Sequence, residues 1–175
     1  MSATYELHRG FTLRRLLPVP RERVFQAWTD PDHLQWFYND ATPMPTDPIQ
    51  VNLTVGGAWR QRMVIDRVTT YVTGGIYQEI ARPERIAFLW GAVGGWPNLD
   101  PARPEDNPLA IVMLDDEADA TAATELDFIL VLPDHLSADR VKAWRNTGMS
   151  AGWSVALDRL VASFVRTAEP QTQAP

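Results

Sequence analysis

Apolar residues near the C-terminus recur three and four positions apart. That spacing is the period of one face of an α-helix, and it extends from Ser137 to Arg166. Ser137 suits an N-cap, and Asp139 suits the positive end of the helix dipole. We therefore predict one continuous helix over this range, about 45 Å long. Its apolar face would consist of Val141, Trp144, Met149, Trp153, Ala156, Leu157, Leu160 and Phe164, with Arg145, Asp158, Arg159 and Arg166 mostly on the other side.

Two glycines, Gly148 and Gly152, stand inside this predicted helix. Glycine in a helix interior costs about 1 kcal/mol relative to alanine, so a specific reason for them is expected. One explanation is tight packing against a strand, where no side chain would fit. The other is a space that the fold leaves empty. The sequence leaves both explanations open.

The chain before this helix alternates between apolar and polar residues, as strands do. Glycine and proline clusters divide it into short segments, and Gly56–Gly57 is a pair typical of a hairpin turn. Gly74–Gly75 indicates a bulge or a turn within a strand. We predict strands over Phe11–Leu17, Gln50–Val55, Ala58–Arg67, Val68–Ile80, Arg85–Trp90, Leu109–Leu114 and Thr121–Leu132, and short helices over Arg21–Trp28 and Asp32–Phe37.

This order of elements is typical of the α+β class, with helices on one side of an antiparallel sheet. A curved sheet wrapped around a long C-terminal helix leaves a space between the two. We expect a single domain over residues 1–167 and a disordered tail over 168–175. The glycine- and proline-rich segment Gly91–Asn107 is predicted to be a long loop or lid, a kind of segment that is often functional.

Composition and charge narrow the classes of partner. The formal net charge is −6, which repels phosphate backbones and anionic membrane surfaces, so neither nucleic acid nor a membrane is an expected partner. The absence of cysteine excludes disulfides, thiol nucleophiles and zinc–thiolate sites. The N-terminus lacks a signal-peptide core, and we expect a cytoplasmic protein, monomeric or homodimeric.

An ordered set of short motifs resembles one known family. The motifs are Val24–Pro31 followed by Leu34–Phe37, then Val55–Trp59, Gly75–Ile80, Arg82–Ile86, Phe88–Trp90, Gly152–Trp153 and Leu157–Leu160. Together they resemble the START-like (SRPBCC) superfamily, and within it domains homologous to the C-terminal part of the activator of heat-shock-protein ATPase. The resemblance implies a helix-grip fold with two short helices after the first strand and a cavity between the sheet and the long helix.

The resemblance does not imply a single activity, because members include lipid carriers, cyclases and chaperone partners in stress responses. The chain also departs from the family pattern in two places, the Gly91–Asn107 loop and the segment Leu132–Ala143. Both lie where the mouth of a pocket is expected, so the family's ligand preference is not carried over.

The sequence contains no clear catalytic or metal-binding motif. His8, His33 and His135 lack ligand-like spacing to acidic residues, and no cofactor motif is present. Alternation places Tyr77 and Glu79 on one strand face, and it places Asp127 beside Glu125 on the solvent side, as part of a cross-strand charge set. We predict no catalytic residue, no metal and no cofactor.

Aromatic and methionine side chains are the best candidates for lining a cavity, because they are apolar and adaptable. The alternative is that they fill a solid core. Tyr77 is the preferred polar candidate, since its phenol has an apolar body and a polar tip. The predicted ligand-binding residues are Trp59, Met63, Tyr77, Phe88, Trp90, Phe128, Trp144, Met149 and Trp153.

Three functions follow from these observations. The preferred one is non-catalytic binding of a small hydrophobic or amphipathic molecule, such as a lipid, between the sheet and the C-terminal helix. The second is a polyketide cyclase-like enzyme that uses the same cavity, which requires a buried ionisable group facing the cavity. The third is a module that contacts a chaperone, which requires an exposed apolar or charged patch.

Overall fold

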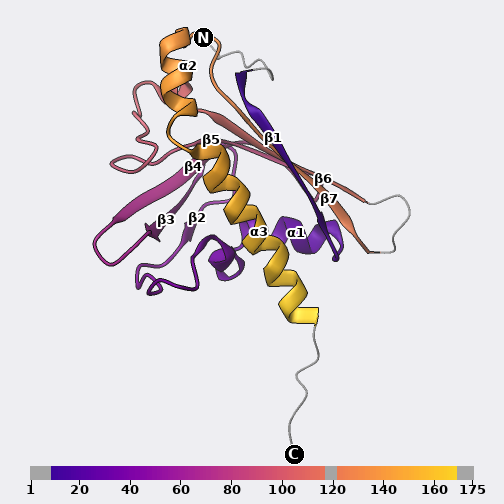
Figure 1. Cartoon of the computed structure of the whole chain (residues 1–175). Coiled ribbons are helices and arrows are strands. Elements are labelled where there is room, and N and C mark those ends of the chain that lie inside the picture. The colour runs from indigo at the N-terminus through magenta and orange to yellow at the C-terminus, as the bar shows by residue number, and fades with distance from the viewer. Residues whose placement is uncertain (1–8, 117–121, 169–175) are drawn as a thin grey trace, which may run out of the picture.

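Seven antiparallel strands form one open sheet in the order β1-β7-β6-β5-β4-β3-β2. The computed structural model describes residues 9–116 and 122–168. Figure 1 shows the two ends of the sheet on either side of the C-terminal helix. The strands are β1 (Phe11–Leu17), β2 (Gln50–Val51), β3 (Ala58–Val64), β4 (Thr70–Ala81), β5 (Arg85–Trp90), β6 (Leu109–Asp116) and β7 (Thr124–Val131).

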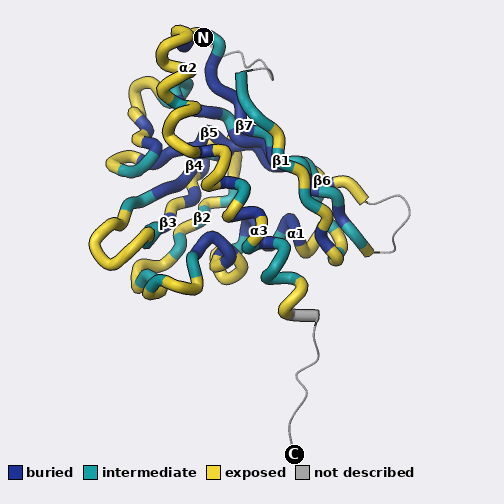
Figure 2. Tube along the Cα trace, in the orientation of Figure 1, coloured by how far each residue is buried: buried dark blue, intermediate teal, exposed yellow. Residues whose placement is uncertain are grey.

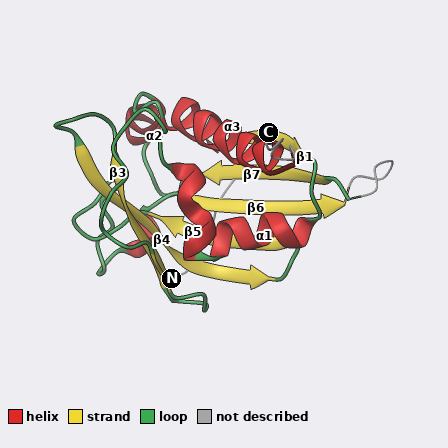
Figure 3. Cartoon of the chain, turned by 90° about the horizontal axis from the view of Figure 1, so that it is seen from below, coloured by secondary structure: helices red, strands yellow, loops and turns green. Residues whose placement is uncertain are grey.

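The helices cover one face of this sheet, which confirms the predicted α+β class and the curved antiparallel sheet with a C-terminal helix. They are α1 (Arg21–Thr29), the 3-10 helices η2 (Pro31–Phe37) and η3 (Pro104–Asp106), α2 (Ala138–Arg145) and α3 (Met149–Ala168). α1 contacts β6, and α3 contacts β1 and η2; Figure 3 shows α3 beside β1 and α1 lying across the neighbouring strands. No described helix is long and apolar enough to cross a membrane.

Strand alternation determines which side chains form the core. In β7, Leu126, Phe128 and Leu130 are buried, while Glu125 and Asp127 point outward and both pair with Arg14 of β1. Figure 2 shows the buried stretches of chain gathered where the helices meet the sheet. The prediction that Asp127 belongs to an outward cross-strand charge set is therefore confirmed.

The predicted continuous helix over Ser137–Arg166 is wrong, because the chain forms two helices. α2 ends at Arg145, and α3 begins at Met149. Between them Gly148 has a φ of 77°, in the left-handed region that ends a right-handed helix and that glycine adopts without a Cβ penalty. The apolar period continues across the break because both helices pack against the same core, so periodicity alone could not reveal it.

The predicted irregularity at Gly74–Gly75 is also misplaced. β4 passes through both glycines in regular pairing with β3, and its register shifts between Tyr77 and Glu79 instead. The shift places Ile80 against the core together with Tyr77, while Glu79 forms an exposed ion pair with Arg85. Tyr77 and Glu79 therefore do not share a face, contrary to the sequence prediction.

Gly75 is required by close packing rather than by a turn. A Cβ at this position would lie 2.6 Å from Phe88 Cδ2 and 2.7 Å from Trp59 Nε1, closer than real Cβ contacts. The aromatic rings of the two neighbouring strands thus lie directly over the backbone of Gly75. This contact fixes the position of the Trp59 ring on β3.

The remaining differences are local. The predicted strand Gln50–Val55 ends at Val51, because Thr54 N–H bonds Asn52 O at 2.8 Å and Gly57 N–H bonds Thr54 O at 2.8 Å in a turn. The 91–107 loop folds back on the sheet, where Trp96 N–H donates to Val72 O at 2.7 Å. The acidic turn Asp115–Asp119 is described only as far as Asp116, and of the predicted tail only Ala168 is described.

Candidate functional site

A cavity of about 440 Å³ lies between α3 and strands β3, β4 and β5. Its volume falls in the range of small-molecule sites, and its walls are mostly apolar. Aromatic side chains come from η2, β3, β4, β5 and the 91–107 loop, and small residues come from the start of α3. The lining residues are Phe37, Trp59, Met63, Ile65, Tyr71, Thr73, Trp90, Trp96, Thr147, Gly148, Met149, Ala151, Gly152, Trp153, Val155, Ala156 and Arg159.

The two glycines of the C-terminal segment lie at this cavity. A Cβ placed on either Gly148 or Gly152 would meet no atom within 4 Å. For Gly152, the explanation of empty space is confirmed and packing against a strand is wrong, whereas Gly148 is also required by its left-handed backbone. A leucine at position 152 would occupy the volume that the glycine leaves open.

The nine residues predicted for ligand binding divide into two groups. Trp59, Met63, Trp90, Met149 and Trp153 line the cavity, and so lie where the prediction requires. The other four lie elsewhere: Tyr77, Phe88 and Phe128 are buried in the core, and Trp144 on α2 packs against it from the outside.

The alternative of a solid core holds for one half of the interior. Trp153 stacks on Phe128 with ring centroids 4.3 Å apart and meets Trp90 edge-on at 5.4 Å. Trp28 stacks against both rings, with its centroid 6.0 Å from that of Phe128 and 6.2 Å from that of Trp153. The aromatic rings thus fill the space beneath α3 near β7, and Trp153 separates this filled part from the cavity near β3 and β4.

The buried position of Tyr77 gives it no role in the cavity. Its side chain is 1% exposed, its hydroxyl has no partner among the described residues, and burial raises the pKa of its phenol. Alternation correctly places Tyr77 on the inner face of β4, but it does not distinguish the filled part of the interior from the cavity. The phenol is thus a core side chain.

Sequence reasoning missed several lining residues, above all Tyr71 and Arg159. Arg159 was placed on the polar side of the helix, but it lies half-buried against the cavity, and its Nη1 donates to Phe37 O at 2.9 Å. It is the only charged residue among the described residues that line the cavity. Its spacing of seven positions from Gly152 and three from Ala156 was the available signal, since such positions share a helix face.

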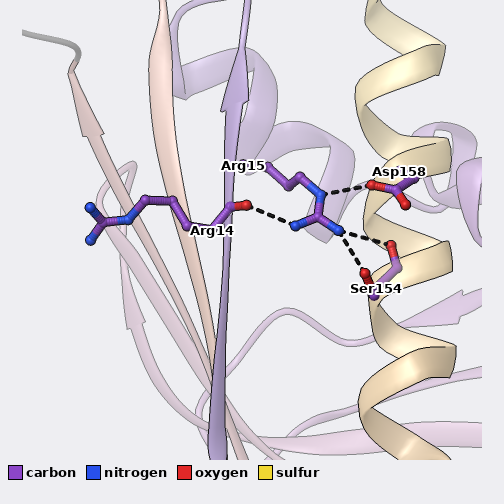
Figure 4. Close-up of polar contacts among 4 residues, drawn as sticks. All are labelled: Arg14, Arg15, Ser154 and Asp158. Carbon is purple, nitrogen blue, oxygen red and sulfur yellow. Dashed lines mark hydrogen bonds and ion pairs between the residues drawn. The ribbon is translucent and has the colours of Figure 1, made fainter.

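On the side of α3 away from the cavity, hydrogen bonds join the helix to the edge strand β1. Figure 4 shows Arg15 of β1 reaching α3, where its Nε donates to Asp158 Oδ1 at 2.8 Å and its Nη2 donates to Ser154 Oγ at 2.8 Å. Asp158 and Arg159 are consecutive, so they point to different sides of the helix. The cavity is therefore on the β3–β4 side of a helix that is held on the β1 side.

The described residues provide no evident catalytic apparatus. No group of three or more potential ligands among them could hold a metal ion. His33 and His135 are exposed and each lies beside one carboxylate, Asp30 at 3.2 Å and Asp106 at 2.7 Å. Burial raises the pKa of Tyr71, against a smaller opposing effect of the Arg159 charge, so this phenol is a proton donor at neutral pH rather than a base.

Several solved structures share this fold. Protein Ms6760 from Mycobacterium smegmatis is 18% identical, with 98% of this chain and 99% of that chain covered and a TM-score of 0.68. Protein NE0264 from Nitrosomonas europaea is 19% identical, with coverages of 90% and 95% and a TM-score of 0.68. PFC0360w, an HSP90 activator from Plasmodium falciparum, is 17% identical, with coverages of 81% and 88% and a TM-score of 0.52.

Comparison at the sequence level identifies the family. No curated protein matches the chain. A family model described as "Activator of Hsp90 ATPase homolog 1-like protein" matches residues 18–164, from the end of β1 to the last turns of α3. This range includes every residue that lines the cavity. The chain therefore belongs to the Activator of Hsp90 ATPase homolog 1-like family, within the START-like (SRPBCC) group that its motifs resemble.

Proposed function

We propose that this domain binds a small hydrophobic or amphipathic molecule, without catalysis, in the cavity between α3 and strands β3–β5. The observation that carries the proposal is that Gly148 and Gly152 leave open space beside aromatic walls. Glycine at position 152 lowers helix stability by about 1 kcal/mol relative to alanine. A cavity that is kept at such a cost is more readily explained by an occupant than by core packing.

The expected binding energy is adequate for this role. Burial of roughly 300 Å² of apolar ligand surface at about 25 cal/mol per Å² contributes roughly 7 kcal/mol before association costs. Association costs are smallest when the walls are formed in advance. Trp153, which stacks on Phe128 and meets Trp90 edge-on, supports such a preformed wall, so micromolar affinity is expected.

The two alternatives have less support. A cyclase-like enzyme needs an acid or base that faces the cavity, and the described lining residues supply only Arg159 and Tyr71 as ionisable groups. A chaperone-binding role is the second candidate, and the family match and the fold shared with the HSP90 activator from Plasmodium falciparum support it. Such a module would use its outer surface, so it does not account for the open cavity.

Native mass spectrometry of the gently purified protein tests the proposal, by comparing its mass before and after denaturation. We expect an adduct of a few hundred daltons that is lost on unfolding. The matched control is Gly152→Leu, whose side chain fills the cavity at a helix position where the Cβ meets nothing. This variant should fold at least as stably as the wild type and carry no adduct. An identical adduct on both proteins would place the ligand outside the cavity and contradict the proposal.

A further inference from the structure

We infer that the cavity takes an anionic amphiphile, with its negatively charged head at Arg159 and Tyr71 and its apolar tail among the tryptophans. The inference rests on the proposed function and adds the chemical class of the ligand. It follows from three features of the lining: the sign of its charge, the unused hydrogen-bond donors at one end, and the apolar walls at the other.

Arg159 is the source of the positive charge. Of the five N–H donors of its guanidinium, one is used by Phe37 O at 2.9 Å, and no carboxylate pairs with it among the described residues. An arginine that is half-buried beside apolar walls gains from an anionic partner, because removal from water is costly for an unpaired charge. Its planar fork fits the paired oxygens of a carboxylate or a phosphate.

Neighbouring arginines show that pairing is the usual arrangement around α3. Arg15 pairs with Asp158 at 2.8 Å, and Arg166 pairs with Asp40 at 3.0 Å. Arg159 lies between these two pairs along the helix and forms no such pair within the described residues. It lines both an outer groove that includes Asp32 and Asp40 and the cavity, whose described lining contains no acidic side chain. In a molecule with a net charge of −6, a cavity with only a positive charge is a local exception that favours an anion.

Tyr71 supplies a second donor at the same end. It is half-buried on β4, and it lines the same cavity as Arg159. Because its phenol stays protonated at neutral pH, the hydroxyl can donate a hydrogen bond to an anionic oxygen. No hydrogen bond of this hydroxyl is found within the described ranges. A head group could therefore accept from Arg159 and Tyr71 together.

The opposite end suits an apolar chain. From Arg159 the cavity follows α3 back to Gly148, a distance of about 16 Å at 1.5 Å per residue. Trp90 and Met149 line this part of the cavity, and Trp96 packs edge-on against Tyr71 at 5.7 Å, beside the head-group end. Ile65 and Val155, both about half exposed, lie where the lining meets solvent. A charged head with a medium-length tail matches this lining.

Three probes with the same chain separate charge from apolar burial. Decanoate, decanol and decyltrimethylammonium are titrated into the full-length protein after removal of bound lipid, below their aggregation concentrations, with calorimetry as the readout. We expect decanoate to bind about tenfold more tightly than decanol and decyltrimethylammonium to bind most weakly. Equal affinity of the three probes would overturn the inference while leaving the proposed function intact. Absence of binding by all three would overturn both.

Substitutions assign the effect to the predicted residue. Arg159→Gln should weaken decanoate about tenfold, on the order of 1.4 kcal/mol, and leave decanol unchanged, which also shows that the cavity is intact. Arg166→Gln is the matched control: it removes the same charge from the same helix, but its side chain pairs with Asp40 outside the cavity lining. Equal losses of decanoate affinity in the two variants, or an equal loss of decanol affinity in Arg159→Gln, would overturn the inference.

Discussion

At the scale of single residues, Tyr77 is a core side chain whose buried hydroxyl has no hydrogen-bond partner among the described residues. A fully buried hydroxyl without a partner loses its hydrogen bonds to water and gains none in return. Phenylalanine has nearly the same shape, so replacement leaves no large void. We predict that Tyr77→Phe stabilises the protein by about 1 kcal/mol, measured by urea unfolding. A clear loss of stability would show that the hydroxyl has a partner in solution.

The same residue predicts a dependence on alkaline pH. Burial raises the pKa of the Tyr77 phenol above its ordinary value of 10.0, so the folded protein holds this proton while the unfolded chain releases it. The free energy of unfolding does not depend on this proton well below pH 10, and it decreases as the pH rises above about 10, where only the unfolded chain releases the proton. Tyr77→Phe should therefore lose less stability than the wild type between about pH 8 and pH 10.5. Parallel losses in the two proteins would contradict the assignment to Tyr77.

At the scale of the elements, two glycines have opposite roles. Gly75 in β4 lies under two aromatic rings, while Gly152 in α3 faces open space. We predict that Gly75→Ala destabilises the protein by roughly 1–3 kcal/mol through overpacking, and that Gly152→Ala stabilises it by up to about 1 kcal/mol through helix propensity. Thermal unfolding of the two variants measures both effects, and changes of the same sign would contradict this account.

At the scale of the whole molecule, Arg15 joins the first strand to the last helix. Its guanidinium bonds Asp158 and Ser154, which lie more than 130 residues later in the chain. We predict that Arg15→Met destabilises the protein by about 1 kcal/mol, because both contacts are partly exposed to solvent. Ligand affinity should remain unchanged, since Arg15 does not line the cavity. A large loss of affinity with little loss of stability would show that the two sides of α3 are coupled.

Strand alternation and helix periodicity were sufficient to predict much of this architecture. The predicted strands Phe11–Leu17 and Arg85–Trp90 have the bounds that the structure shows. The first alternates between partly buried and exposed residues, and the second is a short apolar run that is buried from Ile86 to Trp90. The ordered motifs also led to the correct family. Alternation and short motifs are both local features of the sequence, and together they were sufficient to predict the fold class.

The candidate site was harder to predict, because it depends on departures from regular patterns. The register shift after Tyr77 exchanged the faces of β4, and the left-handed backbone at Gly148 divided a helix whose apolar period is unbroken. Trp96 reaches the cavity from a loop with no periodicity at all. The sequence placed Arg159 on the solvent side of the helix, because helix periodicity separates polar from apolar residues. It does not show whether the space beside a residue is filled by side chains or is a cavity.

The adjacent residues Asp158 and Arg159 separate two tasks on one helix. Asp158 holds α3 to β1, and Arg159 faces the cavity, so a change in one need not disturb the other. Replacement of Arg159 by a neutral or acidic side chain during evolution would change the ligand specificity of the cavity and leave the fold intact. Proteins that share this fold at below 20% identity could then differ in ligand through the replacement of a few interior side chains, with no change of fold.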